Sequence, residues 1–443
     1  MPFPKDFVWG AATSSYQIEG TELGDGRGEC IWQRFSHTPG KTANGDTGDV
    51  AIEHLRRYKD DVAVMKEIGL QGYRFSISWP RVIPQGTGAA NAAGLDFYDR
   101  LLDELLGKGI RPFTTLYHWD LPQALQDRGG WENPESVQWF ADYADLVTRR
   151  FGDRVVSWTT FNEPWCISIL SNLMGIHAPG KQDPVAAYKV AHHLNLAHGA
   201  AVPVIRRNAP GVPAGITLNL YPSFPAKDTP EDRKAAQIYD GWFNRWFLDP
   251  IFKGSYPADI VEILQPMLGD LDLSDVKSAA QPIDFFGMNF YTRSVIAWDE
   301  TAPLKFRNVN PEGSDYTAMD WEIYPDGLRE MLVRVHQDYQ PKAMYVTENG
   351  AAFDDPAPVD GAVEDSRRAD YLKGHFAAAE AAINQGVPLK GYFVWSLMDN
   401  FEWAEGYNKR FGIIYVDYAT QQRTLKQSAL YYQDVIRQHL AQV

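Results

Sequence analysis

Eight short runs of β-branched and aromatic residues recur along the whole chain of 443 residues. Most begin at or just after a glycine or proline and end in polar residues, which is typical of buried strands bounded by turns. Helical periodicity separates several of these runs: apolar residues recur every three or four positions from Leu55 to Ile68, and Gly69 follows as a C-cap. The predicted strands are residues 7–12, 72–77, 112–117, 155–161, 214–220, 284–290, 343–347 and 391–395.

Alternation of strands and helices predicts crossover connections and a parallel sheet. Eight strands that are apolar enough to be buried on both faces predict a single (β/α)8 TIM barrel spanning residues 1–443, with extended loops at its C-terminal face. The competing architecture is a doubly wound sheet, which would place a glycine-rich phosphate loop after its first strand. Residues 13–17 (TSSYQ) stand there instead. The longer segments 221–283 and 291–342 are predicted to be insertions after barrel strands.

The last segment carries a helical pattern of its own. We expect one helix face to hold Leu425, Ala429, Tyr432, Ile436 and Leu440.

Charge and cysteine content exclude several classes of partner. Lysine and arginine number 42 against 57 acidic residues, and the net charge of −15 repels a phosphate backbone. We therefore expect no nucleic-acid partner. The paired arginines are interpreted as solvated helix faces; they are Arg56-Arg57, Arg149-Arg150, Arg206-Arg207 and Arg367-Arg368.

Cys30 and Cys166 cannot form a disulfide framework, which favours a reducing compartment. Residues 1–6 lack the apolar stretch of an export signal, and no apolar run approaches the roughly 18 residues that span a bilayer. We expect a cytoplasmic protein without a membrane partner. Its oligomeric state leaves no mark in the sequence.

Polar and aromatic residues gather where the predicted strands end. In a barrel of this class the chemistry lies at the carboxyl ends of the strands. The third, fourth and sixth runs lead into His118, Asn162-Glu163 and Asn289-Phe290-Tyr291, and the seventh and eighth lead into Glu348 and Trp395.

Glu163 and Glu348 follow the fourth and seventh strands, which lie roughly across an eight-stranded barrel from each other. Two opposed carboxyl groups over an aromatic cleft are what cleavage of a glycosidic bond requires, one as an acid and the other ionised. The alternative is that both are ordinary loop carboxylates or arginine partners. Spacing alone assigns neither role, and it does not distinguish inversion from retention.

Six motifs together resemble glycoside hydrolase family 1, the β-glucosidase family. They occur in order along essentially the whole chain: residues 7–20 (FVWGAATSSYQIEG), 74–81 (RFSISWPR), 117–122 (YHWDLP), 160–164 (TFNEP), 347–350 (TENG) and 395–403 (WSLMDNFEW). The resemblance implies a cofactor-free, metal-free β-glucosidase. Its substrates would be cellobiose and other β-glucosides, with β-galactosides and β-fucosides as secondary substrates.

The resemblance also implies catalytic roles for the two glutamates. Glu163 of the Asn-Glu-Pro motif would be the general acid/base, and Glu348 of Thr-Glu-Asn-Gly would be the nucleophile of a retaining double displacement. Retention predicts carboxyl groups about 5–5.5 Å apart, against about 6.5–9.5 Å for inversion. Arg74 and Tyr291 are the candidates that keep Glu348 ionised, although an arginine in a buried strand can also be structural.

By the same resemblance, one group of residues would bind the non-reducing sugar and another would form the aglycone site. Trp395 would stack beneath the sugar, and His118 could instead be a core histidine. Trp321 would form one wall of the aglycone site, while Cys166 either lines its entrance or is plain packing. The remaining predicted sugar-binding residues are Gln17, Asn162, Asn289, Tyr291, Glu402 and Trp403.

Several alternatives stay open at this stage. A carboxylate at Glu402 would repel a sugar phosphate, which favours free sugars over 6-phospho-β-glycosides. Transglycosylation shares the same intermediate, and a non-catalytic sugar-binding relative would be expected to lack a catalytic glutamate. A metal-dependent hydrolase would need clustered ligands, and His192-His193 on a helix would point in different directions.

Overall fold

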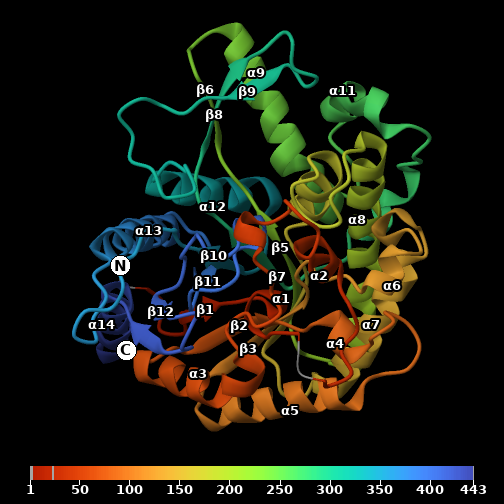
Figure 1. The fold of residues 1–443 in the computed structure, drawn as a ribbon. Coiled ribbons are helices and arrows are strands. Elements are labelled where there is room, and N and C mark those ends of the chain that lie inside the picture. The colour runs from red at the N-terminus through yellow and green to blue at the C-terminus, as the bar shows by residue number, and fades with distance from the viewer. Residues whose placement is uncertain (1–2, 22–23, 443) are drawn as a thin grey trace.

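The centre of the molecule is a closed barrel of eight parallel strands, surrounded by helices (Figure 1). The computed structural model describes residues 3–21 and 24–442. All eight predicted runs form barrel strands, which confirms the predicted TIM barrel. In order around the barrel they are β1 (Val8–Ala12), β2 (Gly72–Ser76), β3 (Arg111–Tyr117), β4 (Ser157–Asn162), β5 (Ala214–Asn219), β7 (Phe285–Asn289), β10 (Met344–Asn349) and β11 (Leu389–Trp395), which pairs again with β1.

Helices connect consecutive strands and cover the outside of the barrel. The predicted helix before Gly69 is α3, and Gly69 ends it with a left-handed φ of 87°. Its apolar stripe buries Val62, Met65 and Ile68. The longer helices are α3 (His54–Ile68), α5 (Ala92–Gly107), α7 (Ser136–Phe151), α8 (Pro184–Asn208), α12 (Pro325–Tyr339), α13 (Ser366–Asn384) and α14 (Gln427–Ala441). Shorter ones are α1 (Ser15–Ile18), α2 (Ile31–Ser36), α4 (Trp79–Val82), α6 (Gln123–Gln126), α9 (Pro230–Asp240), α10 (Trp246–Lys253) and α11 (Ala258–Leu268).

The two predicted insertions leave the barrel after β5 and β7 and meet in a small sheet outside it. This sheet contains β6 (Ser223–Pro225), β8 (Ser294–Trp298) and β9 (Phe306–Asn308), and it lies beside α9 at the top of Figure 1. A second small sheet pairs β12 (Ile414–Val416) with β13 (Arg423–Leu425) after the last barrel strand.

Aromatic side chains from several strands pack together inside the barrel. Phe113 of β3 and Phe393 of β11 pack edge to face with ring centroids 4.8 Å apart, and Tyr345 of β10 lies 5.8 Å from Phe113. Gly10 makes room for this contact, since a Cβ there would lie 2.5 Å from the Phe393 ring. The barrel is therefore a packed core at this level. Six residues of the cavity, His118, Glu163, Asn219, Tyr291, Glu348 and Trp395, lie at or just beyond the carboxyl ends of the strands.

Two predictions about the outer layer were wrong. Leu425 lies in β13, where it pairs with Ile414, and Leu440 is 48% exposed, so neither belongs to the buried face of α14. Arg368 does not lie on a solvated helix face: it is fully buried and forms an ion pair of 2.8 Å with Asp355.

Arg368 belongs to a buried ion network that joins segments far apart in the sequence. Lys426, also fully buried, contacts Asp355 at 2.5 Å and Asp399 at 2.7 Å, and Arg410 contacts Asp399 at 2.7 Å. The network thus pairs acidic residues of the loops after β10 and β11 with basic residues, among them Lys426 at the start of α14, away from water. The network fixes the loop that leads to Glu402.

Among the residues that the structure describes, no helix is long and apolar enough to cross a membrane. The amino-terminal segment considered for an export signal begins with Met1 and Pro2, which lie outside the described residues.

Candidate active site

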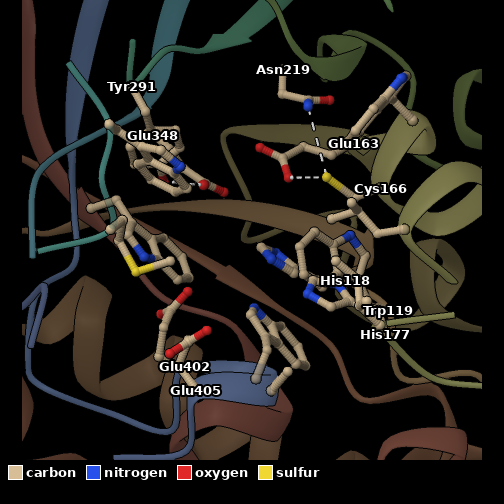
Figure 2. Close-up of a pocket in the computed structure, with 18 of the residues that line it drawn as sticks. His118, Trp119, Glu163, Cys166, His177, Asn219, Tyr291, Glu348, Glu402 and Glu405 are labelled. Atoms are coloured by element: carbon tan, nitrogen blue, oxygen red, sulfur yellow. Dashed lines mark hydrogen bonds between the residues drawn. The ribbon is translucent and has the colours of Figure 1, made fainter. Parts of the chain in front are cut away.

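A cavity of about 700 Å³ opens at the carboxyl ends of the barrel strands (Figure 2). Its size is typical of a small-molecule site. The predicted residues that line it are His118, Glu163, Cys166, Tyr291, Trp321, Glu348, Trp395, Glu402 and Trp403. Four other predicted residues, Gln17, Arg74, Asn162 and Asn289, are buried and reach the cavity residues through hydrogen bonds.

Glu348, near the end of β10, is held by one cation and one hydroxyl. Arg74 Nη1 donates to Glu348 Oε1 at 2.6 Å, and the hydroxyl of Tyr291 donates to Oε2 at 2.7 Å. Burial raises the pKa of Glu348, while the Arg74 charge and the Tyr291 hydroxyl oppose that rise. Arg74 therefore contacts the expected nucleophile, as predicted, and both carboxylate oxygens of Glu348 have a donor.

Glu163 follows β4 directly and has only neutral donors. Asn289 Nδ2 donates to Oε1 at 2.7 Å, and the thiol of Cys166 donates to Oε2 at 3.2 Å. Its backbone adopts the left-handed region with a φ of 53°, a conformation that costs about 1–2 kcal/mol for a residue with a Cβ. The turn aims the carboxyl group into the cavity, opposite Glu348 (Figure 2).

The two carboxyl groups differ in their affinity for a proton. Burial, followed by the charge of Glu348, raises the pKa of Glu163 from its ordinary value of 4.5 to about 8. Arg74 forms an ion pair with Glu348, so when only one of the two carboxyl groups is ionised, Glu348 carries the negative charge. The site can thus hold one protonated and one ionised carboxyl group near neutral pH.

A layer of amides and one arginine connects the two glutamates. Asn162 Oδ1 accepts from Arg74 Nη2 at 2.8 Å and from Asn289 Nδ2 at 3.0 Å, so its amide nitrogen faces His118 Nε2 at 3.1 Å. Burial, with a smaller effect of Arg74, lowers the pKa of His118 well below its usual range. His118 is therefore neutral, and its Nε2 can accept the Asn162 proton.

Glu402 lines another side of the cavity, and the buried Gln17 lies behind it. Gln17 Nε2 donates to the carbonyl of Phe401 at 2.8 Å and lies 3.4 Å from Glu402 Oε2. Burial, then the charges of Glu348 and Glu163, raises the pKa of Glu402 to about 8. A carboxyl group of this kind can donate a hydrogen bond to a neutral hydroxyl or accept one from it.

Aromatic rings provide flat apolar walls. The His118 and Trp395 rings are stacked with centroids 5.7 Å apart, and Trp119 lies 4.6 Å from Trp403. Trp321 lies 5.2 Å from Tyr291, on the side of the cavity that holds the expected nucleophile. Pyranose C–H faces suit such rings, while the surrounding carboxyl and amide groups suit sugar hydroxyls.

Sequence reasoning missed several lining residues. Glu405 adds a further acidic side chain beside Glu402, His177 packs against Trp119, and Asn219 contacts Cys166 (Figure 2). Asn219 is the last residue of β5 and the next to last of the predicted run 214–220, so its position carried a usable signal. Glu405 ends the short 3-10 helix Trp403–Glu405, and His177 lies in a loop; only the folded chain brings both segments to the cavity.

Within the described residues, no group of three or more His, Cys, Asp or Glu side chains is arranged to hold a metal ion. His192 contacts the Tyr256 hydroxyl and Asp275, while His193 contacts the Trp131 carbonyl. The two adjacent histidines face different partners, as their spacing on a helix predicts.

Two buried, opposed glutamates in an aromatic-walled cavity are what cleavage of a glycosidic bond requires, so the site is that of a glycoside hydrolase. The family model for glycosyl hydrolase family 1 matches residues 1–440, and the chain belongs to that family. It is an enzyme that hydrolyses glycosidic bonds.

Several relatives match nearly the whole chain. Beta-glucosidase A of Thermotoga maritima is 49% identical over 98% of both chains, and Beta-glucosidase A of Acetivibrio thermocellus is 47% identical over 98% of both. A bifunctional beta-D-glucosidase/beta-D-fucosidase of Bifidobacterium breve is 44% identical over 100% of this chain and 99% of its own. The solved Thermotoga maritima family 1 β-glucosidase in complex with deoxynojirimycin superposes with a TM-score of 0.97 over 99% of each chain, at 49% identity.

Proposed function

We propose that this enzyme is a retaining β-glucosidase that removes terminal non-reducing β-D-glucosyl residues from cellobiose and other β-glucosides. The observation that carries this proposal is the unequal environment of the two buried glutamates. Arg74 and Tyr291 favour an ionised Glu348, while burial beside a like charge favours a protonated Glu163.

In the first step, Glu348 Oε attacks the anomeric carbon, and Glu163 donates its proton to the departing glycosidic oxygen. The products are a glycosyl ester of Glu348 and the free aglycone. Because Glu348 then carries no charge, the pKa of Glu163 falls, and Glu163 is left as a carboxylate.

In the second step, Glu163 takes a proton from water, and the resulting hydroxide oxygen displaces Glu348 from the anomeric carbon. Two inversions at that carbon restore the β configuration. We expect the carboxyl groups to stand at the separation of about 5–5.5 Å that retention requires.

The proposed sugar site uses the residues around the floor of the cavity. Trp395 would stack under the ring, and Gln17, His118, Glu402 and Trp403 would bind hydroxyl groups. Asn162 and Asn289 would act close to the 2-hydroxyl and the acid/base. Trp321 would contact the aglycone, and β-galactosides and β-fucosides would be secondary substrates.

A 6-phospho-β-glycosidase is the weaker alternative. After burial, the groups that most raise the pKa of Glu402 are Glu348, Glu163 and Glu405, all of them acidic. A phosphate bound beside Glu402 would be repelled by the ionised Glu348. Transfer to an acceptor sugar would use the same intermediate, in competition with hydrolysis.

We further propose that residues 1–443 act as one catalytic barrel in the cytoplasm, without nucleic-acid or membrane partners. Glu163 and Glu348 come from opposite halves of the chain, which supports a single catalytic unit. The buried, unpaired Cys30 and Cys166 are compatible with a reducing compartment.

The test is to follow hydrolysis of aryl β-glucoside, β-galactoside and 6-phospho-β-glucoside by NMR. We expect β-glucose as the first product and a preference for the unphosphorylated glucoside. A first-formed α product would overturn retention, and faster hydrolysis of the phosphorylated substrate would overturn the substrate assignment.

Two variants test the roles of the glutamates. Glu163→Gln should lose most activity on substrates with poor leaving groups but keep a rapid first step on 2,4-dinitrophenyl β-glucoside, which needs no proton. Glu348→Gln should be inactive on both. If both variants slow the first step by the same factor for every leaving group, the assignment is contradicted.

A further inference from the structure

We propose that Cys166 is a positioning residue for Glu163: its thiol donates a hydrogen bond that orients the carboxyl group and tunes its affinity for a proton. This inference rests on the proposed role of Glu163 as the acid/base. It assigns the cysteine a part in catalysis that acts through another residue.

The geometry places the thiol directly on the acid/base. Cys166 Sγ lies 3.2 Å from Glu163 Oε2, while Asn289 Nδ2 lies 2.7 Å from Oε1. Each oxygen of Glu163 thus has one neutral donor. The Cys166 backbone N–H also donates to the Glu163 carbonyl at 3.0 Å, which fixes the sulfur three residues after the glutamate at the start of the π-helical segment Cys166–Leu173.

The neighbours of the sulfur keep its proton pointed at Glu163. Burial, then the charge of Glu163, raises the pKa of the Cys166 thiol well above its usual range, so the group stays an S–H donor. Asn219 Nδ2, at the end of β5, lies 3.7 Å from Sγ and donates to it. The chain of donors therefore runs from Asn219 to Cys166 to Glu163, as the dashed lines in Figure 2 show.

A thiol suits both proton states that Glu163 must adopt. Sulfur is a weak acceptor, so it competes poorly for the proton that Glu163 must deliver to the glycosidic oxygen in the first step. Its S–H is a weak donor, so it favours the carboxylate required in the second step without abolishing the acid required in the first. A cation at this position would hold Glu163 permanently ionised.

The experiment compares Cys166→Ala and Cys166→Ser through the pH dependence of kcat/KM for an aryl β-glucoside. Loss of the donor in Cys166→Ala should move the alkaline limb upward by about half a pH unit, which is about threefold in proton affinity. The serine hydroxyl should bring the limb back to the wild-type position or below it. Cys30→Ala is the matched control, because the other cysteine of the chain contacts Arg27 and does not line the cavity.

A second measurement isolates the base step. Hydrolysis of 2,4-dinitrophenyl β-glucoside is expected to be limited by the second step, so its kcat should fall about three- to tenfold in Cys166→Ala and recover in Cys166→Ser. A purely structural role would lower the melting temperature and kcat while leaving the alkaline limb in place. That result, or equal shifts in the alanine and serine variants, would overturn the proposal.

Glu163→Gln separates this proposal from the proposed function. If Glu163→Gln abolishes the alkaline limb while Cys166→Ala leaves it unmoved, the positioning role alone is wrong. If Glu163→Gln retains the limb, the limb belongs to another group, and both the acid/base assignment and the inference that rests on it fail.

Discussion

Replacing Glu163 by glutamine should stabilise the protein by an amount that grows with pH. The pKa of Glu163 rises from 4.5 to about 8 on folding, because of burial and the nearby charge of Glu348. The unfolded chain therefore gives up this proton at lower pH than the folded protein does. The stability that the protonated form supplies is complete below pH 4.5 and is lost as the pH rises toward 8.

The magnitude follows from about 1.4 kcal/mol for each pH unit across that interval. Wild type should lose about 3 kcal/mol by pH 7 and about 4 kcal/mol by pH 8, relative to a variant that stays neutral at this position. Glutamine stays neutral at every pH, and its side-chain oxygen can still accept the hydrogen bond from Asn289. At about 2.1 cal/mol/K per residue, a chain of 443 residues unfolds with an entropy of about 0.9 kcal/mol/K, so the melting temperature should differ by about 3–4 °C at pH 7.

The assay is the melting temperature of Glu163→Gln and wild type, measured by calorimetry from pH 5 to pH 8.5. Glu312→Gln, at an exposed position, is the matched control and should track wild type throughout. The two curves for Glu163→Gln and wild type should nearly meet at pH 5 and separate steadily above it. A temperature difference that does not change with pH would refute the argument that Glu163 retains its proton through burial.

Three other substitutions test separate parts of the structure. Arg74→Met should move the acid limb of kcat/KM upward and lower activity at pH 6 by about 10²–10³-fold, because Glu348 loses its ion-pair partner; a loss below tenfold with an unmoved limb would contradict this. Lys426→Met leaves the buried network with excess negative charge and should cost about 3–5 kcal/mol in chemical unfolding, whereas an unchanged midpoint would show that the network is dispensable. Trp321→Ala should lower kcat/KM for cellobiose about tenfold while sparing kcat for 2,4-dinitrophenyl β-glucoside; equal losses on both would place Trp321 outside the aglycone site.

The barrel strands could be predicted because each is a short local run of β-branched and aromatic residues, as expected for a buried strand. The run predicted as 112–117 is β3, Arg111–Tyr117, and the run predicted as 155–161 is β4, Ser157–Asn162. Strands of three residues such as β9 and β13 could not be found this way, since pairing with distant segments decides them. Leu425 illustrates the difference: its helical spacing is real, but pairing with Ile414 determines its structure.

The site was predictable where a residue ends a barrel strand and much less so elsewhere. Glu163, Asn289 and Glu348 follow this rule because parallel strands deliver their carboxyl ends to one face. Arg368 shows the opposite case. Its helix position favoured solvent, but acidic residues from other segments bury it in an ion network.

The sequence by itself determined the barrel and the family motifs and pointed to the two glutamates as the candidate catalytic pair, because hydrophobic patterning and strand ends are local properties. Only the tertiary structure decided how these carboxyl groups differ. Arg74 and Tyr291 bind Glu348, while Asn289 and Cys166 bind Glu163, and these partners come largely from other strands. The proton affinity of a buried carboxyl group depends on the charges and donors around it, and that environment exists only once the barrel has closed.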